Sequence, residues 1–355
     1  MKKVSLKQQT GPIAFILCGA LFVSITMAVS IGSVSLPFGR IWGIIFHQIF
    51  PNWDFFKREW PQNEVGIVWQ IRFPRVLLGA LVGAGLSIAG ATIQSLVRNS
   101  LADPYLLGIS SGACAGAVFV ILFAGRFWGV ALQGIYGVSF MAFLGATLAF
   151  LLVFLIARQG QGLTPTRMIL AGLAVSYIFM AATNFMVYMQ QRNGAEAAIF
   201  WMLGGLGGAR WDRLAIPLIA TLGSLLVFTV QARPLNALLL GDENAIALGV
   251  DIVRFRRLLF IVTSVLTGVL VAVSGSIGFV GLIVPHAVRM VVGADHRRVL
   301  PIGALVGAIF LIWTDVFSRT VLAPRELPLG IVTGFIGAPF FVWLLRRGKN
   351  NSFTG

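Results

Sequence analysis

The sequence predicts an all-α polytopic membrane protein with about ten transmembrane helices. Hydrophobic residues make up 57% of its 355 residues and charged residues only 11%, whereas about 25% of the residues of a soluble domain are charged. The apolar residues form runs of about 20, which is the length that a helix needs to cross a bilayer. The basic residues stand at the ends of these runs, as is typical of membrane proteins.

Ten runs are predicted to be transmembrane helices. The first is expected to be retained, because it is longer than the apolar core of a signal peptide. The run at 277–294 is short and rich in Gly and Pro, which predicts a broken or tilted helix. The segment 33–74 is predicted to be a long outer loop with a short interfacial helix and turns. The ten runs are 12–32, 75–97, 106–125, 130–157, 168–190, 214–232, 258–274, 277–294, 299–320 and 328–345.

The loops predict the orientation of the chain. An even number of spans places both termini on one side of the membrane, and the short loops of that side carry the excess of Lys and Arg. Both termini are therefore predicted to be cytoplasmic. The net charge of +15 lies in these loops and not on one soluble face, so nucleic-acid binding is not predicted.

Catalytic and cofactor chemistry is missing from the sequence. Cys18 and Cys114 lie in apolar runs without metal-ligand spacing, and neither a histidine metal pattern nor a phosphate-cradling Gly-Lys loop occurs. Asp315 comes closest to an ion-coupling residue of the membrane interior, but it lies near the outer end of its span. We expect no catalytic residue, no metal site and no bound cofactor, so any energy must come from a partner.

Pairs of glycines stand four residues apart on three of the predicted spans. This spacing lets two helices approach closely in lipid. Packing within one subunit and packing between subunits both remain open at this stage. The pairs are Gly79 and Gly83, Gly303 and Gly307, and Gly330 and Gly334.

The stretch "GDENAIALGV" (241–250) is a short polar segment between two apolar runs. Asp242 is expected to cap a short helix there, and Gly249 is expected to end it. Ala245, Ile246 and Leu248 would then offer a small apolar surface to a soluble partner. An ordinary surface turn is the alternative that the residues alone leave open.

Four strings together resemble the FecCD-type permease family, the membrane subunits of ATP-binding-cassette (ABC) importers for ferric siderophores, haem and cobalamin. The family's usual "RNPLA" is "RNSLA" here, with Ser100 in place of the proline, and the resemblance covers the chain from about residue 70 to 345. The strings are "IRFPRVLLGALVGAGLSIAGATIQSLVRNSLADPYLLGISSGA" (71–113), "GDENAIALGV" (241–250), "GSIGFVGLIVPHAVR" (275–289) and "ELPLGIVTGFIGAPFFVWLL" (326–345).

The resemblance implies a single transmembrane permease domain over 1–355 with the fold of type II, cobalamin-importer-like ABC importers. It implies a homodimer or a heterodimer with a related permease, two ABC ATPase subunits that hold ATP and Mg, and an extracytoplasmic substrate-binding protein. The chain would be a multi-pass protein of the cytoplasmic (inner) membrane, in contact with lipid and without ATPase activity of its own. The expected cargo is a ferric siderophore, with haem and cobalamin as alternatives. An ion-coupled secondary transporter and a scaffold subunit are the alternative classes.

The resemblance also implies roles for residues at both ends of the membrane. Docking of the binding protein, through exposed ion pairs of about 0.2–1 kcal/mol each, would use Arg72, Arg75 and Arg319, for which ordinary interfacial snorkelling is the alternative. Coupling to the ATPase would use the region 233–257, with Asp242, Glu243, Ala247, Leu248, Gly249 and Val250. The cytoplasmic gate would use Asn99, Leu101, Thr164 and Thr166.

The translocation pathway would lie between two subunits and be lined largely by the fifth and tenth spans. Met180, Asn184 and Tyr188 stand four residues apart and so share one helix face. They are expected to line the pathway, with ordinary helix packing as the alternative. Asn184 is the strongest of the three, because an Asn in mid-span is costly without a partner or a wet cavity.

Overall fold

The structure is a computed structural model that describes residues 10–32, 36–51, 60–100, 102–127, 135–158, 164–190 and 192–351, and every regular element in these ranges is helical. The N-terminal part comprises α1 (Thr10–Ser30), α2 (Phe38–Ile49), α3 (Gln62–Val65), a π-helical segment (Gly66–Arg72) and α4 (Phe73–Val97). A short turn (Pro104–Leu107), α5 (Ile109–Phe127), α6 (Ile135–Ala157), α7 (Pro165–Tyr188) and α8 (Arg192–Met202) follow. The rest comprises a turn (Trp211–Arg213), α9 (Ala215–Val230), α10 (Ala232–Leu239), α11 (Asp242–Ala247), α12 (Ile252–Ser274), α13 (Val280–Val292), α14 (His296–Thr320) and α15 (Leu329–Asn351).

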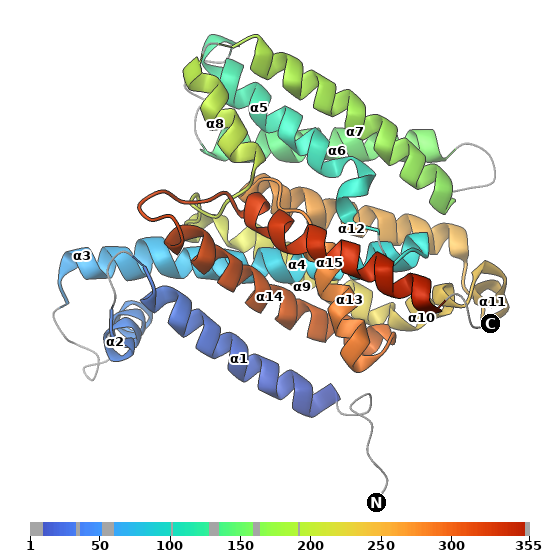
Figure 1. Ribbon diagram of the computed structural model, residues 1–355, viewed down its shortest axis with the longest axis horizontal. Coiled ribbons are helices and arrows are strands. Elements are labelled where there is room, and N and C mark those ends of the chain that lie inside the picture. The colour runs from blue at the N-terminus through green and yellow to red at the C-terminus, as the bar shows by residue number, and fades with distance from the viewer. Residues whose placement is uncertain are drawn as a thin grey trace, which may run out of the picture.

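Each of the ten predicted spans corresponds to a helix of the structure. Within the described residues, seven helices are long and apolar enough to cross a membrane, and three shorter apolar helices (Ile109–Phe123, Val280–Val292 and Leu329–Leu344) complete the set. The beginning of α1, the end of α15 and the short helix α11 lie at the same end of the molecule (Figure 1). This end will be called the α11 end, and the opposite end, with α2 and α3, the α3 end.

The predicted start of the second span at residue 75 was wrong. A continuous helix runs from Gln62 to Val97 over 36 residues, so the outer loop is shorter than 33–74. The misleading residue was Pro74, which lacks an N–H and crowds the carbonyl one turn earlier in a regular α-helix. Here the preceding turns, Gly66–Arg72, are π-helical, and such a widened turn accommodates the proline without ending the helix.

Helix α4 runs through the middle of the fold (Figure 1), and most of its residues are buried against α9, α12, α13 and α14. Its glycines make this packing possible. A Cβ atom on Gly83 would overlap the carbonyl oxygen of Gly307 on α14, and one on Gly90 would overlap the carbonyl oxygen of Gly281 on α13. Thus Gly83 and Gly307 serve packing within one subunit, one of the two alternatives that the sequence left open.

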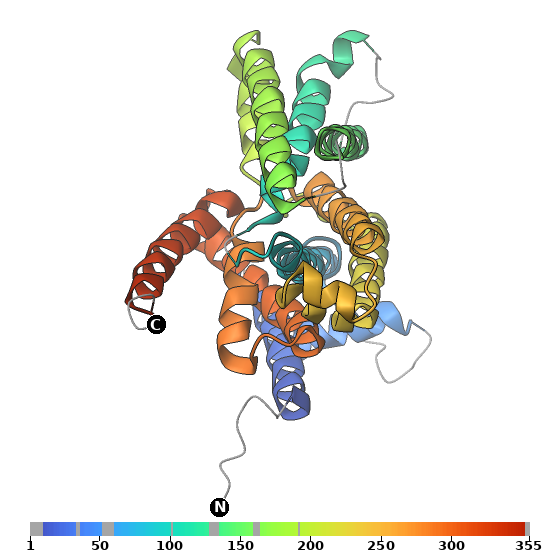
Figure 2. The ribbon, with the colours of Figure 1, turned by 90° about the vertical axis from the view of Figure 1, so that its right-hand side faces the viewer.

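Helices α5, α6, α7 and α8 form a second group, which stands beside the helices around α4 and meets them mainly through α12 (Figure 2). Small residues again set the contact, since a Cβ atom on Gly112 of α5 would overlap the carbonyl oxygen of Gly145 on α6. One face of α7 is buried, and most of the residues on the rest of its surface are exposed. This group therefore leaves α7 accessible to lipid or to a partner.

Gly83→Ala is expected to lower the free energy of unfolding by about 1–3 kcal/mol, because α4 and α14 must separate to admit the methyl group. Thermal unfolding in mild detergent measures the effect. The matched control is Gly223→Ala on α9, where nothing lies within 4 Å of the added Cβ and alanine favours the helix by about 0.5–1 kcal/mol. Equal stability of the two variants would contradict the proposed contact.

Candidate functional site

At the α11 end, the stretch 241–250 forms the short exposed helix that the sequence predicted. Gly241 precedes α11 with φ of +104°, and Gly249 follows it with φ of +81°. The N–H of Gly249 donates to the oxygen of Ile246 (2.8 Å) and that of Val250 to the oxygen of Ala245 (3.0 Å). These two bonds form a Schellman motif, so the prediction that Gly249 ends the helix is confirmed.

The exposed side of α11 combines large apolar side chains with one acidic side chain. The side chains of Ile246 and Leu248 are 62% and 66% exposed, and Glu243 and Ala247 are exposed beside them. Ala245, which was expected on this surface, is instead buried beneath the helix. The exposed patch is therefore smaller than predicted, but it projects from the end of the bundle (Figure 1).

Asp242 does not act as the cap that the sequence predicted. It is the first residue of α11, and Gly241 occupies the capping position. Its carboxylate accepts a hydrogen bond from Arg256 of α12 (2.8 Å) and lies 3.5 Å from the guanidinium of Arg98, directly after α4. Neither arginine was singled out from the sequence, although Arg256 lies in the predicted coupling region 233–257 and Arg98 begins "RNSLA".

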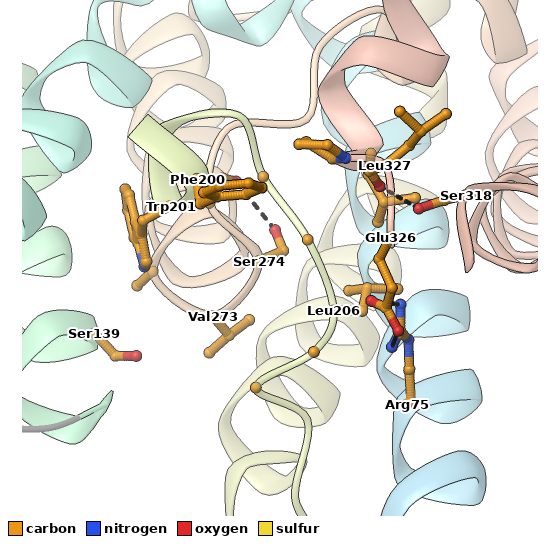
Figure 3. A pocket seen from close by; sticks show the side chains of 18 of the residues that line it. Arg75, Ser139, Phe200, Trp201, Leu206, Val273, Ser274, Ser318, Glu326 and Leu327 are labelled. Atoms are coloured by element: carbon orange, nitrogen blue, oxygen red, sulfur yellow. Dashed lines mark hydrogen bonds and ion pairs between the residues drawn. The ribbon is translucent and has the colours of Figure 1, made fainter. Parts of the chain in front are cut away.

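At the α3 end, Arg75 is buried between two carboxylates. Its Nε and Nη2 donate to Oδ1 of Asp315 (3.0 and 2.9 Å), and its Nη1 and Nη2 donate to the two oxygens of Glu326 (both 2.9 Å; Figure 3). The guanidinium of Arg75 holds the pKa of the Glu326 carboxyl below its usual range. The side chains of Arg75 and Asp315 are both almost fully buried, so Asp315 is a partner in a buried ion pair.

Arg72 and Arg319 also use their donors inside the subunit. Arg72 donates to the oxygens of Val29 and Ser30 (3.0 and 3.2 Å), and Arg319 donates to those of Ala28 and Ile31 at the end of α1. The side chains of Arg75 and Arg319 are only 10% and 8% exposed. The three arginines therefore lie together at one end, as predicted, but not as exposed cations. Docking of a binding protein through them remains a prediction.

A cavity of about 850 Å³ opens at the α3 end between α8, the end of α12 and the segment 322–329 (Figure 3). Arg75 and Arg213 both line it. Arg213 is buried with its guanidinium carbon 4.4 Å from the ring centre of Tyr136, and its Nε and Nη2 have no hydrogen-bond partner in the structure. Arg75 is thus hydrogen-bonded to two carboxylates, whereas these two nitrogens of Arg213 have no hydrogen-bond partner.

Between α12 and α13 the chain is unwound over 275–279, whereas α13 itself is continuous through Pro285, so the run at 277–294 is a short helix preceded by an unwound segment and not a broken one. The segment that follows α4 holds the unwound segment in place. The hydroxyl of Tyr105 accepts from the N–H of Ile277 (2.6 Å), and the hydroxyl of Ser110 donates to that of Ser276 (3.1 Å). The carboxyl of Asp103 accepts from the N–H of Tyr105 (2.9 Å) and from the backbone of Phe279. Burial raises the pKa of Asp103 to about 6 against these two hydrogen bonds, which lower it.

Three of the four predicted gate residues are described by the structure, and they are exposed residues at helix ends. Asn99 follows α4, and its N–H donates to the oxygen of Gln94 (3.0 Å). Thr164 directly precedes α7, and Thr166 lies in its first turn. Leu101 lies outside the described residues. The structure therefore places three of the four at helix ends, and their gating role remains a prediction.

The predicted pathway residues are exposed on α7. Met180 and Tyr188 are 45% and 84% exposed, and Asn184 between them is exposed as well. They do not pack within this subunit, so the alternative of packing inside one chain is not what the structure shows. Elsewhere in the described residues, no group of three His, Cys, Asp or Glu side chains could hold a metal ion.

Comparison with known proteins supplies the family. The model of the FecCD transport family matches residues 20–347. A cobalamin import system permease protein of Halobacterium salinarum is 45% identical over 287 residues, which cover 81% of this chain and 75% of that protein. A hemin transport system permease protein of Yersinia pestis is 39% identical over 300 residues, which cover 83% and 88%.

One solved structure matches almost the whole chain. It is described as an inward-facing conformation of an ABC transporter assigned to the metal-chelate type, and it aligns with a TM-score of 0.80 at 29% identity, over 95% of this chain and 99% of that one. The predicted fold class is confirmed by this match. The chain therefore belongs to the FecCD transport family and is a multi-pass permease subunit of an ABC transporter, whose ATPase is a separate subunit.

Proposed function

We propose that this permease carries an iron chelate, most simply a ferric siderophore, across the cytoplasmic membrane, with haem and cobalamin as the alternative cargoes. The names of the relatives support the two alternative cargoes, hemin and cobalamin, and the metal-chelate type given for the matching solved structure supports an iron chelate. The permease would act as a dimer, with two ABC ATPases at the α11 end and a binding protein at the α3 end. Both termini would then be cytoplasmic, and no cofactor would be bound by this chain.

The exposed α11 is the observation that carries this proposal. A six-residue helix held by glycines at both ends, with Ile246 and Leu248 facing outward, fits a groove on a soluble partner. The alternative of an ion-coupled carrier has no support in the described residues. Asp315, the acid on which it would depend, is paired with Arg75.

Purification in mild detergent tests the assembly, and reconstitution tests the cargo. We expect a near-stoichiometric ABC ATPase to co-purify with the tagged permease. Proteoliposomes with that ATPase and the cognate binding protein are then expected to take up a ⁵⁵Fe-labelled siderophore, hemin or cyanocobalamin only when ATP is supplied. A stable permease without an ATPase, or uptake without ATP, would contradict the proposal.

Glu243→Arg is expected to reduce ATP-driven transport by about tenfold or more, because a reversed charge on the exposed face of α11 costs about 1.4 kcal/mol or more of ATPase binding. Recovery of the ATPase on the tagged permease measures the binding. The matched control is Glu196→Arg, the same reversal at an exposed residue of α8 at the other end, which is expected to leave ATPase recovery unchanged. Equal recovery with Glu243→Arg would remove the coupling role from α11.

A further inference from the structure

Asp242 joins α11 to two other parts of the subunit through one carboxylate oxygen. Oδ1 accepts a hydrogen bond from Nη2 of Arg256 at 2.8 Å and lies 3.5 Å from Nη2 of Arg98. The side chain of Arg256 is 5% exposed, whereas that of Arg98 is 41% exposed. The bond to α12 is therefore short and sheltered, and the contact with Arg98 is longer and open to water.

Arg98 occupies a backbone position that usually selects glycine. It follows the last residue of α4 with φ of 52° and ψ of 38°, in the left-handed region, where a side chain carries a steric cost. Its own N–H donates back to the oxygens of Gln94 and Ser95. From this position the side chain of Arg98 reaches Asp242.

The last turn of α4, just before Arg98, is fixed to three other helices. Nε2 of Gln94 donates to the oxygen of Gly281 on α13 (3.2 Å). Oγ of Ser95 lies 2.6 Å from Nε2 of His296 on α14, and the N–H of His296 donates to Oδ1 of Asn236 on α10 (2.9 Å). These hydrogen bonds hold the last turn of α4 in place. A movement of α11 relative to this turn would therefore change the distance between Arg98 and Asp242.

We propose that the ion pair of Arg98 and Asp242 transmits the movement of α11 to Arg98 and Asn99, which follow the fixed last turn of α4, so that Arg98 is a positioning residue for the cytoplasmic gate. This inference rests on the proposed function. The bond from Arg256 to Asp242 keeps α11 attached to α12. Arg98 contacts the same Asp242 carboxylate and would move when that carboxylate moves. A half-exposed pair contributes little to stability, so loss of transmission and loss of folding can be measured apart.

The test uses the complete transporter in proteoliposomes and a probe that does not depend on the cargo. Cys18 and Cys114 are replaced by Ala, and the exposed Ser100 is replaced by Cys. A membrane-impermeant maleimide then reports how fast position 100 is labelled with and without ATP. In the parent protein, ATP is expected to change the labelling rate. With Arg98→Gln, this response to ATP is expected to fall at least about fivefold, with ATPase recovery and thermal stability unchanged and with partial rescue by Arg98→Lys.

The matched control is Arg297→Gln, which removes an exposed arginine from the first turn of α14, outside the predicted coupling region 233–257. It is expected to keep the parent's response to ATP. Asp242→Asn weakens the bond from Arg256 as well as the contact with Arg98, so Arg98→Gln is expected to have no further effect on the response to ATP when it is added to Asp242→Asn.

A normal response in Arg98→Gln, independent effects of the two substitutions, or a parallel loss of thermal stability would each overturn the proposal. So would loss of ATPase recovery in Arg98→Gln, since Arg98 would then serve docking. Failure of the parent protein to retain an ATPase would instead contradict the proposed function.

Discussion

Arg75→Met is expected to lower the free energy of unfolding by about 3–5 kcal/mol, which is the range for breaking a buried ion pair by removing one partner. The loss falls mainly on Asp315, which is buried and bonded to Arg75 by both Nε and Nη2. Arg319, at 3.5 Å, offers it only a longer contact. Glu326 is half exposed and is hydrated when Arg75 is removed. Thermal unfolding in detergent measures the change.

Arg213→Met is the matched control, because both arginines line the same cavity and both are buried. Among the described residues no hydrogen bond or ion pair joins a carboxylate to Arg213, and its Nε and Nη2 have no partner, so its replacement leaves no buried carboxylate unpaired there. We expect no loss of stability, or a gain that is limited by its contact with Tyr136. Equal losses in both variants would mean that side-chain volume, and not charge, is responsible.

A second substitution separates charge from packing at Arg75. If the cost of Arg75→Met comes from the unpaired carboxylate of Asp315, then Asp315→Asn added to Arg75→Met is expected to recover part of the lost stability. Additive losses would contradict this account. The result also bears on docking, since an arginine already bonded to two carboxylates of its own subunit must exchange one of them to bind an acidic partner.

Hydropathy alone was sufficient to predict the ten spans, because a helix in lipid satisfies its backbone internally and must be apolar over its whole length. It was not sufficient at residues 62–74. There the helix continues through polar residues and into a proline by widening its turns, and nothing local in the sequence distinguishes this from a loop. The packing of α2 and the π-helical segment around Trp60 and Trp69 is a tertiary effect.

Part of the candidate site could likewise be predicted from local sequence, and part of it depends on residues far apart in the chain. The helix α11 could be predicted because its limits are set locally, by Gly241 and Gly249. The partners of Arg75 could not, since Asp315 and Glu326 lie 240 and 251 residues further along the chain. The link between Asp242 and Arg98 is equally non-local. The pairs of Arg75 with Asp315 and of Arg98 with Asp242 join residues far apart in the sequence, whereas the exposed pair of Arg254 and Asp251 is local.

The stability of the protein is expected to respond to the protonation of Asp103. Its carboxyl accepts from the N–H of Tyr105 and from the backbone of Phe279 at the end of the unwound segment 275–279, and burial raises its pKa to about 6, from about 3.9 in an unfolded chain. The folded protein therefore holds this proton more tightly than the unfolded chain. The stabilisation is complete below the unfolded pKa and is lost as the pH rises through about 6.

Asp103→Asn removes this titration while retaining an oxygen that accepts from the N–H of Tyr105. Between pH 4 and pH 7 the wild type is expected to lose about 2 kcal/mol of stability relative to the variant. Melting of both proteins across this range gives the difference directly, and parallel profiles would mean that another group titrates. Because Asp103 also bonds the backbone of Phe279, a confirmed difference would show that deprotonation of Asp103 at neutral pH weakens the contact between the segment after α4 and the unwound segment 275–279. Asp103 follows Asn99 closely in the sequence, so transport by the same variant tests whether a weakened contact is needed for the gate to move.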